Sequence, residues 1–226
     1  MIIYGKQVFL YYLEHHKEKI EEIYLAKEID KPLFNKIAKC GVKIQKLDFI
    51  KAQAMATGGN HQGFLAKVKD YEFCDFNSLK KSDFLLILYN LNDVGNIGAI
   101  IRTAYALGAC GIVIIAKDIN AANITRTSQG AIVDMKIALS NDALTCINEL
   151  KQTGFSIIAS AKDGKSIVGY KKEGKKALIL GNESEGIPNK ILSKCDEIVG
   201  IKMSNNFDSL NVSAACAILC DRILNG

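Results

Sequence analysis

Three stretches of this chain place side chains that can bind a ligand or help to move a proton beside glycine-bearing turns. They are residues 92–104 (NDVGNIGAIIRTA), 178–188 (LILGNESEGIP) and 201–213 (IKMSNNFDSLNVS). Each follows or contains an apolar run that is typical of a buried strand. Because ligands of open α/β sheets bind at the ends of strands, we expect all three stretches to meet at one site.

The first stretch contains Asn96 and, six residues later, Arg102. Arginine is rare in this chain, since only three of its 29 basic residues are arginines, namely Arg102, Arg126 and Arg222. The planar guanidinium binds phosphate through two parallel hydrogen bonds, which a lysine ammonium cannot do. The sequence therefore predicts that the geometry of Arg102 matters and not only its charge.

The other two stretches contribute a G-x-E-x-x-G pattern at Gly181, Glu183 and Gly186 and the sequence S-L-N-V-S that begins at Ser209. A glycine at the end of a strand allows the backbone to approach a ligand closely. Ser209 is predicted to cap a helix that runs to about Ile223. Taken alone, S-L-N-V-S is also compatible with an ordinary helix cap that has no further role.

Two other nucleotide-binding motifs are not met. The glycines at 95 and 98 follow a strand and open a helix, but they do not complete the G-x-G-x-x-G pattern of a dinucleotide site, because residue 101 is isoleucine. The G-K-[ST] sequence of a phosphate-binding loop is absent as well. Both classes of site are therefore disfavoured.

Length and composition indicate a folded α/β protein. The chain has 226 residues, of which 49% are hydrophobic, and it contains no apolar run of 18 residues and no signal-peptide pattern at its start. Its seven cysteines form no C-x-x-C pair and have only three histidines as potential partners. We expect a soluble cytoplasmic protein with reduced thiols that pack in the core, and no metal site.

The basic charge is concentrated in the first third of the chain. Residues 1–82 hold 14 lysines against 10 acidic residues, whereas residues 83–226 hold 15 basic against 14 acidic ones. This imbalance favours a polyanionic partner. The loop at 57–63 (TGGNHQG), with His61, is either a mobile connection or a tip that follows a nucleic-acid backbone. Arg126 is either an RNA contact or a residue of an exposed helix surface.

Hydrophobic periodicity predicts a small α/β unit at 1–70, a linker at 71–82 and a parallel α/β domain at 83–226. The expected helices are 4–16, 33–39, 48–56, 97–107, 123–130, 142–152, 188–193 and the C-terminal one. The expected strands are 23–26, 42–47, 63–68, 84–89, 111–115, 132–139, 155–159, 177–181 and 197–202.

The three motifs, taken together and in this order, resemble those of the SpoU (TrmH-like) branch of the SPOUT RNA methyltransferases. The resemblance covers most of 84–226. Residues 1–70, with Ile3-Tyr4-Gly5 near the start and His61-Gln62-Gly63 near the end, are similar to the small RNA-binding domain that many members have. Within the family, the chain resembles enzymes that act on a guanosine of 23S ribosomal RNA.

This resemblance implies a fold, a reaction and a set of roles. It implies a homodimer with a trefoil-knotted domain, an exception to the rule against threaded chains, and methyl transfer from S-adenosylmethionine to a ribose 2′-hydroxyl. It implies cofactor contacts from Gly181, Ile201, Met203, Leu210 and Asn211. The catalytic set that it implies is Arg102, Asn96, Glu183, Ser209 and Asn211, with His61, Arg126 and Arg102 contacting RNA.

Within that set, Arg102 is expected to hold the phosphate beside the target ribose and to stabilise the developing alkoxide. Arginine stays protonated in proteins, so it is not expected to act as the base itself. Asn96 would orient Arg102, and Glu183 would brace the cofactor loop. The chain departs from the family at Lys202, where proline is common, so the backbone is expected to be less fixed there and an additional charge lies nearby.

Two alternative functions stay open on the sequence alone. One is ribose methylation of transfer RNA. The other is a non-catalytic RNA-binding or ribosome-assembly role for the same fold.

Overall fold

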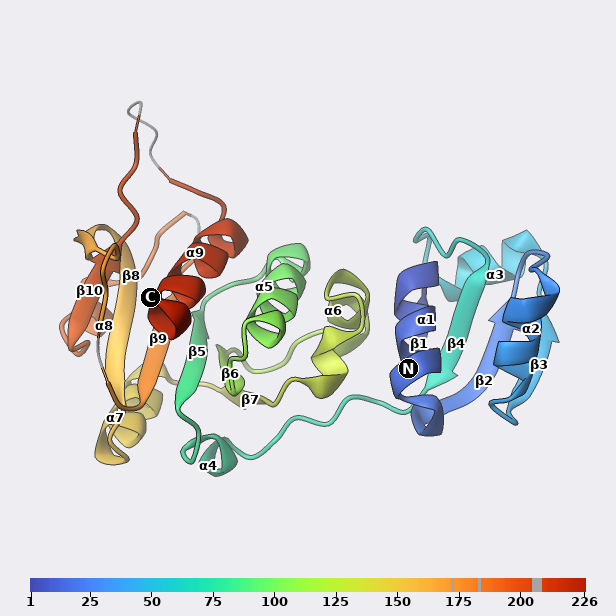
Figure 1. The fold of residues 1–226 in the computed structure, drawn as a ribbon, viewed down its shortest axis with the longest axis horizontal. Coiled ribbons are helices and arrows are strands. Elements are labelled where there is room, and N and C mark those ends of the chain that lie inside the picture. The colour runs from blue at the N-terminus through green and yellow to red at the C-terminus, as the bar shows by residue number, and fades with distance from the viewer. Residues whose placement is uncertain (172, 183, 205–208) are drawn as a thin grey trace. The chain divides into compact units, whose positions relative to one another are not determined.

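The computed structural model describes residues 1–171, 173–182, 184–204 and 209–226. These residues form two compact units, labelled by their elements in Figure 1. The small unit contains residues 1–72 together with 120–130, and the large unit contains 73–119 and 131–226. The segment 120–130, which the sequence placed within the C-terminal domain, thus packs with the N-terminal residues.

The small unit is built on a four-stranded sheet in the order β1-β4-β2-β3, in which β4 runs antiparallel to both of its neighbours and β2 pairs with β3 in parallel. Its strands are β1 (Ile2–Tyr4), β2 (Ile20–Leu25), β3 (Lys43–Lys46) and β4 (Phe64–Val68). Its helices are α1 (Lys6–His15), η1 (Lys17–Lys19), α2 (Lys31–Ala38), α3 (Phe49–Met55) and α6 (Ala121–Thr127). Aspartates fix the starts of α2 and α3, because Asp30 and Asp48 accept hydrogen bonds from the backbone N–H three residues on, each at 2.8 Å.

The predicted start of the first helix in the small unit was wrong. The helix predicted from residue 4 begins at Lys6, and the preceding residues form β1, where Ile3 pairs with Ala66 of β4. Gly5 separates the two elements with a φ of 100°, a value that favours glycine. A three-residue strand is too short to show a period of its own in the sequence.

The large unit is a six-stranded sheet in the order β10-β8-β9-β5-β6-β7, in which every pair of strands is parallel. Its strands are β5 (Phe84–Tyr89), β6 (Gly111–Ile115), β7 (Ile137–Ser140), β8 (Ser156–Ser166), β9 (Lys176–Leu180) and β10 (Glu197–Gly200). Its helices are α4 (Phe76–Leu79), α5 (Val94–Ala106), η2 (Ala131–Asp134), α7 (Ala143–Gln152), α8 (Asn189–Leu192) and α9 (Val212–Asn225). The predicted parallel α/β architecture is confirmed.

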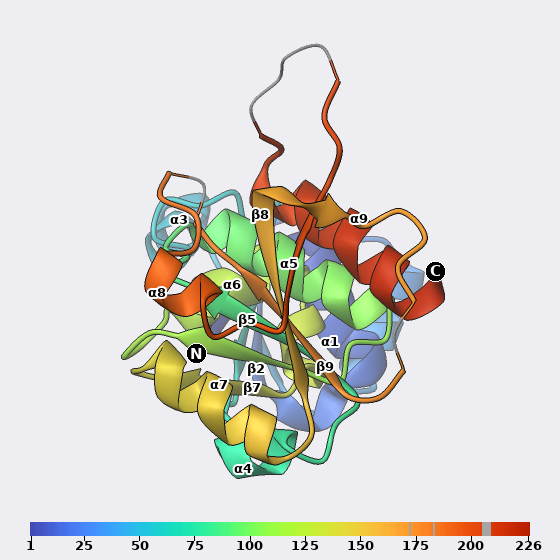
Figure 2. The same cartoon turned by 90° about the vertical axis from the view of Figure 1, so that its left-hand side faces the viewer.

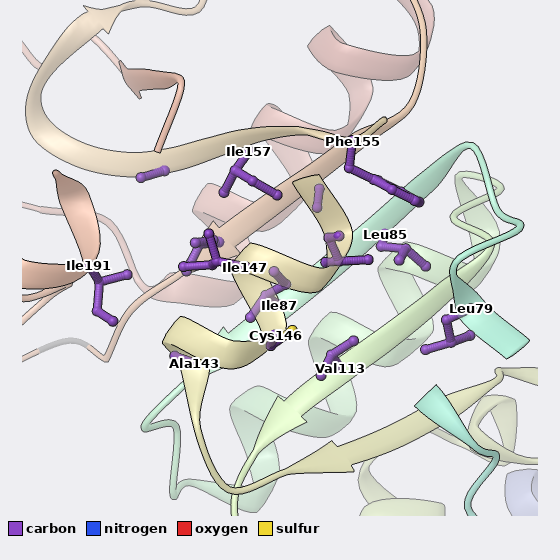
Figure 3. Packing of buried hydrophobic residues seen from close by; sticks show 14 of the residues in the cluster. Leu79, Leu85, Ile87, Val113, Ala143, Cys146, Ile147, Phe155, Ile157 and Ile191 are labelled. Carbon is purple, nitrogen blue, oxygen red and sulfur yellow. The ribbon is translucent and has the colours of Figure 1, made fainter. Parts of the chain in front are cut away.

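Helices cover both faces of this sheet. On one face, shown in Figure 3, α7 packs Cys146 and Ile147 against strand residues such as Leu85 and Ile157. Residues of β5 alternate between the faces, so Leu86 and Leu88 are buried on the other one. There α5 and α9 lie side by side, as Figure 2 shows. This pair of helices brings the first and the third motif together.

Three further predictions differ from the structure. The predicted linker contains α4, whose Leu79 is fully buried. The strand predicted at 132–139 is divided into η2 and the shorter β7. The strand predicted at 155–159 continues to Ser166, because its second half pairs with β10. In each case contacts with residues distant in sequence override the local pattern.

The thiols and the helices agree with a folded, reduced chain. All seven cysteines are free, and Cys146, Cys216 and Cys220 are buried. Burial raises the pKa of Cys146 to about 12, so this thiol stays protonated and packs as an apolar group. None of the helices in the described part of the chain is long and apolar enough to cross a lipid bilayer.

We expect Asp196→Ala to lower the free energy of unfolding by about 1–2 kcal/mol, because the side chain joins three elements of the large unit. Its Oδ2 accepts from the Ile157 backbone N–H at 2.8 Å and its Oδ1 from Lys151 Nζ at 2.7 Å. The control is Asp221→Ala, since that carboxylate is exposed and accepts from Asn225 on the same helix. Urea denaturation measures both variants, and equal midpoints would contradict the role of Asp196.

Candidate active site

A pocket of about 360 Å³ lies where the second and third motifs meet. Its wall comes from β8, the ends of β9 and β10, and the start of α9. Its lining residues are Ser160, Ala161, Lys162, Gly181, Asn182, Ser184, Glu185, Gly186, Val199, Gly200, Ile201, Met203, Ser209, Leu210, Val212, Ala215 and Leu219. The volume is within the range of small-molecule sites, and the position beyond strand ends is the one expected for an open α/β sheet.

Gly181, the first residue after β9, is glycine because the backbone of the next turn is too close for any side chain. A Cβ at this position would lie 2.5 Å from both the carbonyl carbon and the carbonyl oxygen of Gly186. Asn182 holds the turn in place, since its Oδ1 accepts from the backbone N–H groups of Ser184 at 3.0 Å and Glu185 at 2.6 Å. At Gly181 and Gly186 the turn therefore offers backbone atoms to the pocket.

A hydrogen bond between two asparagines joins the first motif to the third. Asn96 lies in the first turn of α5, where its backbone N–H donates to Asp93 Oδ1 at 2.7 Å. Its side-chain Oδ1 accepts from Asn211 Nδ2 at 2.9 Å. Asn211 is the N-cap of α9, and its own Oδ1 accepts from the Ser213 backbone N–H at 2.9 Å. One residue thus fixes both the start of α9 and the side chain of Asn96.

This arrangement corrects the prediction for Ser209. The helix begins at Val212 with Asn211 as its cap, so Ser209 does not cap it. Ser209 instead lies in the pocket wall, two residues before the cap. Both residues have side chains suited to capping, and the sequence alone does not decide between them.

Arg102 lies on α5, outside the lining of the pocket, and its side chain is exposed. Within the ranges that the structure describes, no hydrogen bond or ion pair engages its guanidinium. Arg102 and Asn96 share a helix that packs against α9. The guanidinium is therefore accessible to an anion outside the pocket.

The structure brings most of the predicted site residues to one place. Gly181, Ile201, Met203, Ser209 and Leu210 line the pocket. Asn211 and Asn96 are joined to each other beside it. Glu183 lies outside the described residues.

Lys202 lies apart from this pocket. It lines a neighbouring hollow of about 340 Å³, whereas the residues on either side of it line both cavities. The departure from the family at this position therefore leaves the lining of the main pocket unchanged.

One wall of the pocket was not predicted from the sequence. Ser160, Ala161 and Lys162 belong to the extension of β8 that was not predicted. The extension packs tightly against the end of β10, since a Cβ at Gly200 would lie 2.7 Å from the carbonyl oxygen of Ala161. A glycine within a strand often marks a close approach of another backbone, so Gly200, directly before Ile201, was a signal for this contact in the sequence.

The two residues predicted to contact RNA in the small unit differ in exposure. Arg126 is exposed at the end of α6, and its guanidinium lies 5.7 Å from the centre of the Tyr4 ring. His61, in contrast, is only 4% exposed, and its Nδ1 accepts from the Gly63 backbone N–H at 3.0 Å. In this conformation His61 holds the 57–63 loop together, and its side chain is buried rather than presented at the surface.

Sequence models of two known families match this chain. Residues 83–221 match the SpoU rRNA methylase family, and residues 2–74 match the substrate-binding domain of RNA 2′-O ribose methyltransferases. The residues that line the pocket all lie within the first of these two matches.

Curated relatives agree with this assignment. A protein of Bacillus subtilis named as a TrmH-family tRNA/rRNA methyltransferase is 34% identical, over 80% of this chain and 76% of its own length. A 23S rRNA (guanosine-2′-O-)-methyltransferase of Vibrio parahaemolyticus is 29% identical, over 96% of this chain and 93% of its own length.

Solved structures share the fold. An rRNA methyltransferase from Sinorhizobium meliloti with bound AdoMet has a TM-score of 0.78 at 20% identity, over 98% of this chain and 85% of its own. A SpoU methyltransferase from Streptomyces viridochromogenes in complex with AdoMet has a TM-score of 0.77 at 19% identity, over 98% of this chain and 88% of its own. At these identities the likeness establishes the architecture alone.

Proposed function

Because this chain belongs to the SpoU rRNA methylase family, we propose that it transfers a methyl group from S-adenosylmethionine to a ribose 2′-hydroxyl of RNA. The match of residues 2–74 to an RNA 2′-O ribose methyltransferase substrate-binding domain supports both the acceptor atom and the kind of substrate. Relatives that align over nearly their whole length are named as 23S rRNA guanosine-2′-O-methyltransferases. A guanosine of 23S ribosomal RNA is therefore the proposed target.

The pocket residues fit S-adenosylmethionine, which supplies an electrophilic methyl group on a sulfonium. Gly181 and Gly186 have no side chain at the two ends of the turn after β9, so backbone groups there can approach a ligand closely. Lys162 and Glu185 place one positive and one negative side chain in the lining, which suits a ligand that carries an ammonium and a carboxylate. Ile201, Met203 and Leu210 supply apolar surface for the rest of it.

The residues of the first motif would position the RNA. Arg102 is the proposed phosphate ligand, because its exposed guanidinium lies on the helix that is joined to the pocket through Asn96 and Asn211. A bidentate contact with the phosphate would orient the neighbouring ribose, and the positive charge would stabilise the alkoxide that develops on its 2′-oxygen. Asn96 acts in this proposal as a positioning residue.

A dimer and a knot complete the proposal. On the paired helices α5 and α9, Tyr105 and Ile218 remain 44% and 38% exposed, which is the kind of surface that a second copy of the chain would cover. We propose that two copies pair through these helices. The trefoil knot of the family is likewise proposed for the large unit. Light scattering that finds a monomer at micromolar concentration would contradict the proposed pairing.

The observation that carries the function is that the second and third motifs line one pocket, and that the first motif is joined to the third beside it through the Asn96–Asn211 hydrogen bond. Mapping of ribose methylation in ribosomal and transfer RNA from cells that lack the protein tests it. We expect the loss of one 2′-O-methylguanosine from 23S ribosomal RNA. A loss in transfer RNA would identify the other substrate class, and unchanged methylation in both RNAs would contradict an enzymatic role.

A further inference from the structure

The small unit exposes two large apolar side chains next to each other at the start of α3. Phe49 is 67% exposed and Ile50 is 81% exposed, whereas Phe9 and Phe64 of the same unit are buried. Asp48 caps the helix and so fixes the backbone beneath Phe49. An aromatic ring that lies in solvent on a fixed stretch of backbone contributes little to folding, which indicates a binding role.

His61 lies beside this ring and has an unused hydrogen-bonding group. The centres of the Phe49 and His61 rings are 5.4 Å apart. Because Nδ1 of His61 accepts from the Gly63 backbone N–H, the proton of the neutral imidazole is on Nε2. Nε2 is buried and has no hydrogen-bond partner among the residues that the structure describes. A buried N–H group without an acceptor costs free energy, so a ligand that supplies an acceptor would be favoured.

We propose that Phe49 and His61 form a nucleobase-binding site for an unpaired base of the RNA substrate. The base stacks on the ring of Phe49, and an oxygen or ring nitrogen on its edge accepts from Nε2–H of His61. Phe49 must turn away from His61 to open the site, which its high exposure permits, because few contacts hold its rotamer. This inference rests on the proposed function, since it states how the RNA is held.

The surroundings suit a nucleic acid better than an apolar partner. The Lys27 side chain lies against Gly63, where a Cβ would come within 2.4 Å of its Cγ, and Lys27 Nζ lies 4.6 Å from the centre of the Phe64 ring. Lys51, two residues after Phe49 on α3, has a side chain that is 74% exposed. Cations beside an exposed aromatic ring are the combination that binds single-stranded RNA, in which bases stack and phosphates are neutralised.

The test compares variants of the full chain for binding to a fluorescein-labelled RNA hairpin whose unpaired loop contains 2-aminopurine. Phe49→Ala is expected to weaken binding by about 5- to 100-fold and to abolish the change in 2-aminopurine fluorescence, whereas Phe49→Tyr stays within about two-fold of wild type. The salt dependence of binding should not change in Phe49→Ala, because stacking releases no counterions. His61→Phe, which keeps an aromatic ring but removes the N–H donor, should weaken binding without loss of the fluorescence change.

Ile50→Ala is the matched control, because Ile50 is the more exposed neighbour and is not an aromatic residue. Phe49→Ala binding within two-fold of wild type, or an equal loss in Ile50→Ala, would overturn the base-stacking site. The thermal midpoint of each variant verifies that the small unit is folded. The two proposals can fail separately. If the wild-type protein does not transfer a methyl group but binds the RNA loop in a Phe49-dependent way, the proposed function fails and the base-stacking site stands.

Discussion

Replacement of Arg102 with lysine is expected to slow methyl transfer by about 30- to 1000-fold, although lysine keeps the positive charge. The loss of one charge-assisted interaction in the transition state costs roughly 2–4 kcal/mol, which corresponds to this range of rates. Lysine lacks the planar guanidinium that can hold a phosphate by two parallel hydrogen bonds and orient the ribose at the same time. Arg102→Ala should be at least as slow.

Cofactor affinity should change little in both variants, because Arg102 is not among the residues that line the pocket. Arg222→Lys is the control, since Arg222 is also an exposed helical arginine but lies in the last turn of α9. Single-turnover methylation and calorimetry of S-adenosylmethionine binding measure the two effects separately. An Arg102→Lys enzyme within a few-fold of wild type would rule out the geometric role, and lost cofactor binding would place Arg102 in a different part of the site.

Gly181→Ala is expected to weaken S-adenosylmethionine binding on the order of 100-fold, because the added methyl group has no space. The new Cβ would lie 2.5 Å from backbone atoms of Gly186, and backbone cannot turn aside as the end of a side chain can. The turn that Asn182 holds must then move, and a shift of about 1 Å in a positioned site costs roughly two orders of magnitude. Overpacking should also lower the free energy of unfolding by about 1–3 kcal/mol.

Gly95→Ala is the matched control for this substitution. Gly95 lies in the first turn of α5, outside the pocket lining, and a Cβ there would meet only the side chain of Asp93, at 3.0 Å. Calorimetry of cofactor binding compares the two alanine variants with wild type. Unchanged affinity in Gly181→Ala would show that the turn after β9 does not shape the cofactor site.

Two strands with continuous apolar sequence, β5 and β6, were predictable to the residue. β5 and β6 have the predicted bounds because each is buried between two layers of helices, so that every position is apolar. β8 was cut short in the prediction because residues 160–166 are mostly polar and become a strand only by pairing with β10. Local patterns do not contain the information about such a partner.

The residue types of the site were predictable, whereas its connections were not. The role of Gly181 was predictable because a backbone that approaches a ligand closely at a strand end has no room for a Cβ. The hydrogen bond between Asn96 and Asn211 joins residues 115 positions apart, and it depends on how α5 and α9 pack. The burial of His61 depends in the same way on the fold of its loop, in which Gln62 and Gly63 both have positive φ values.

The central claim is that this chain methylates a ribose 2′-hydroxyl of RNA, and one reaction with the purified chain tests it most directly. Wild-type protein is incubated with S-adenosylmethionine labelled in its methyl group and with 23S ribosomal RNA, and the RNA is digested to nucleosides for mass spectrometry. The account predicts the label in 2′-O-methylguanosine with wild type and almost none with Arg102→Ala. Label on a base instead of the ribose, or equal label with Arg102→Ala, would contradict it.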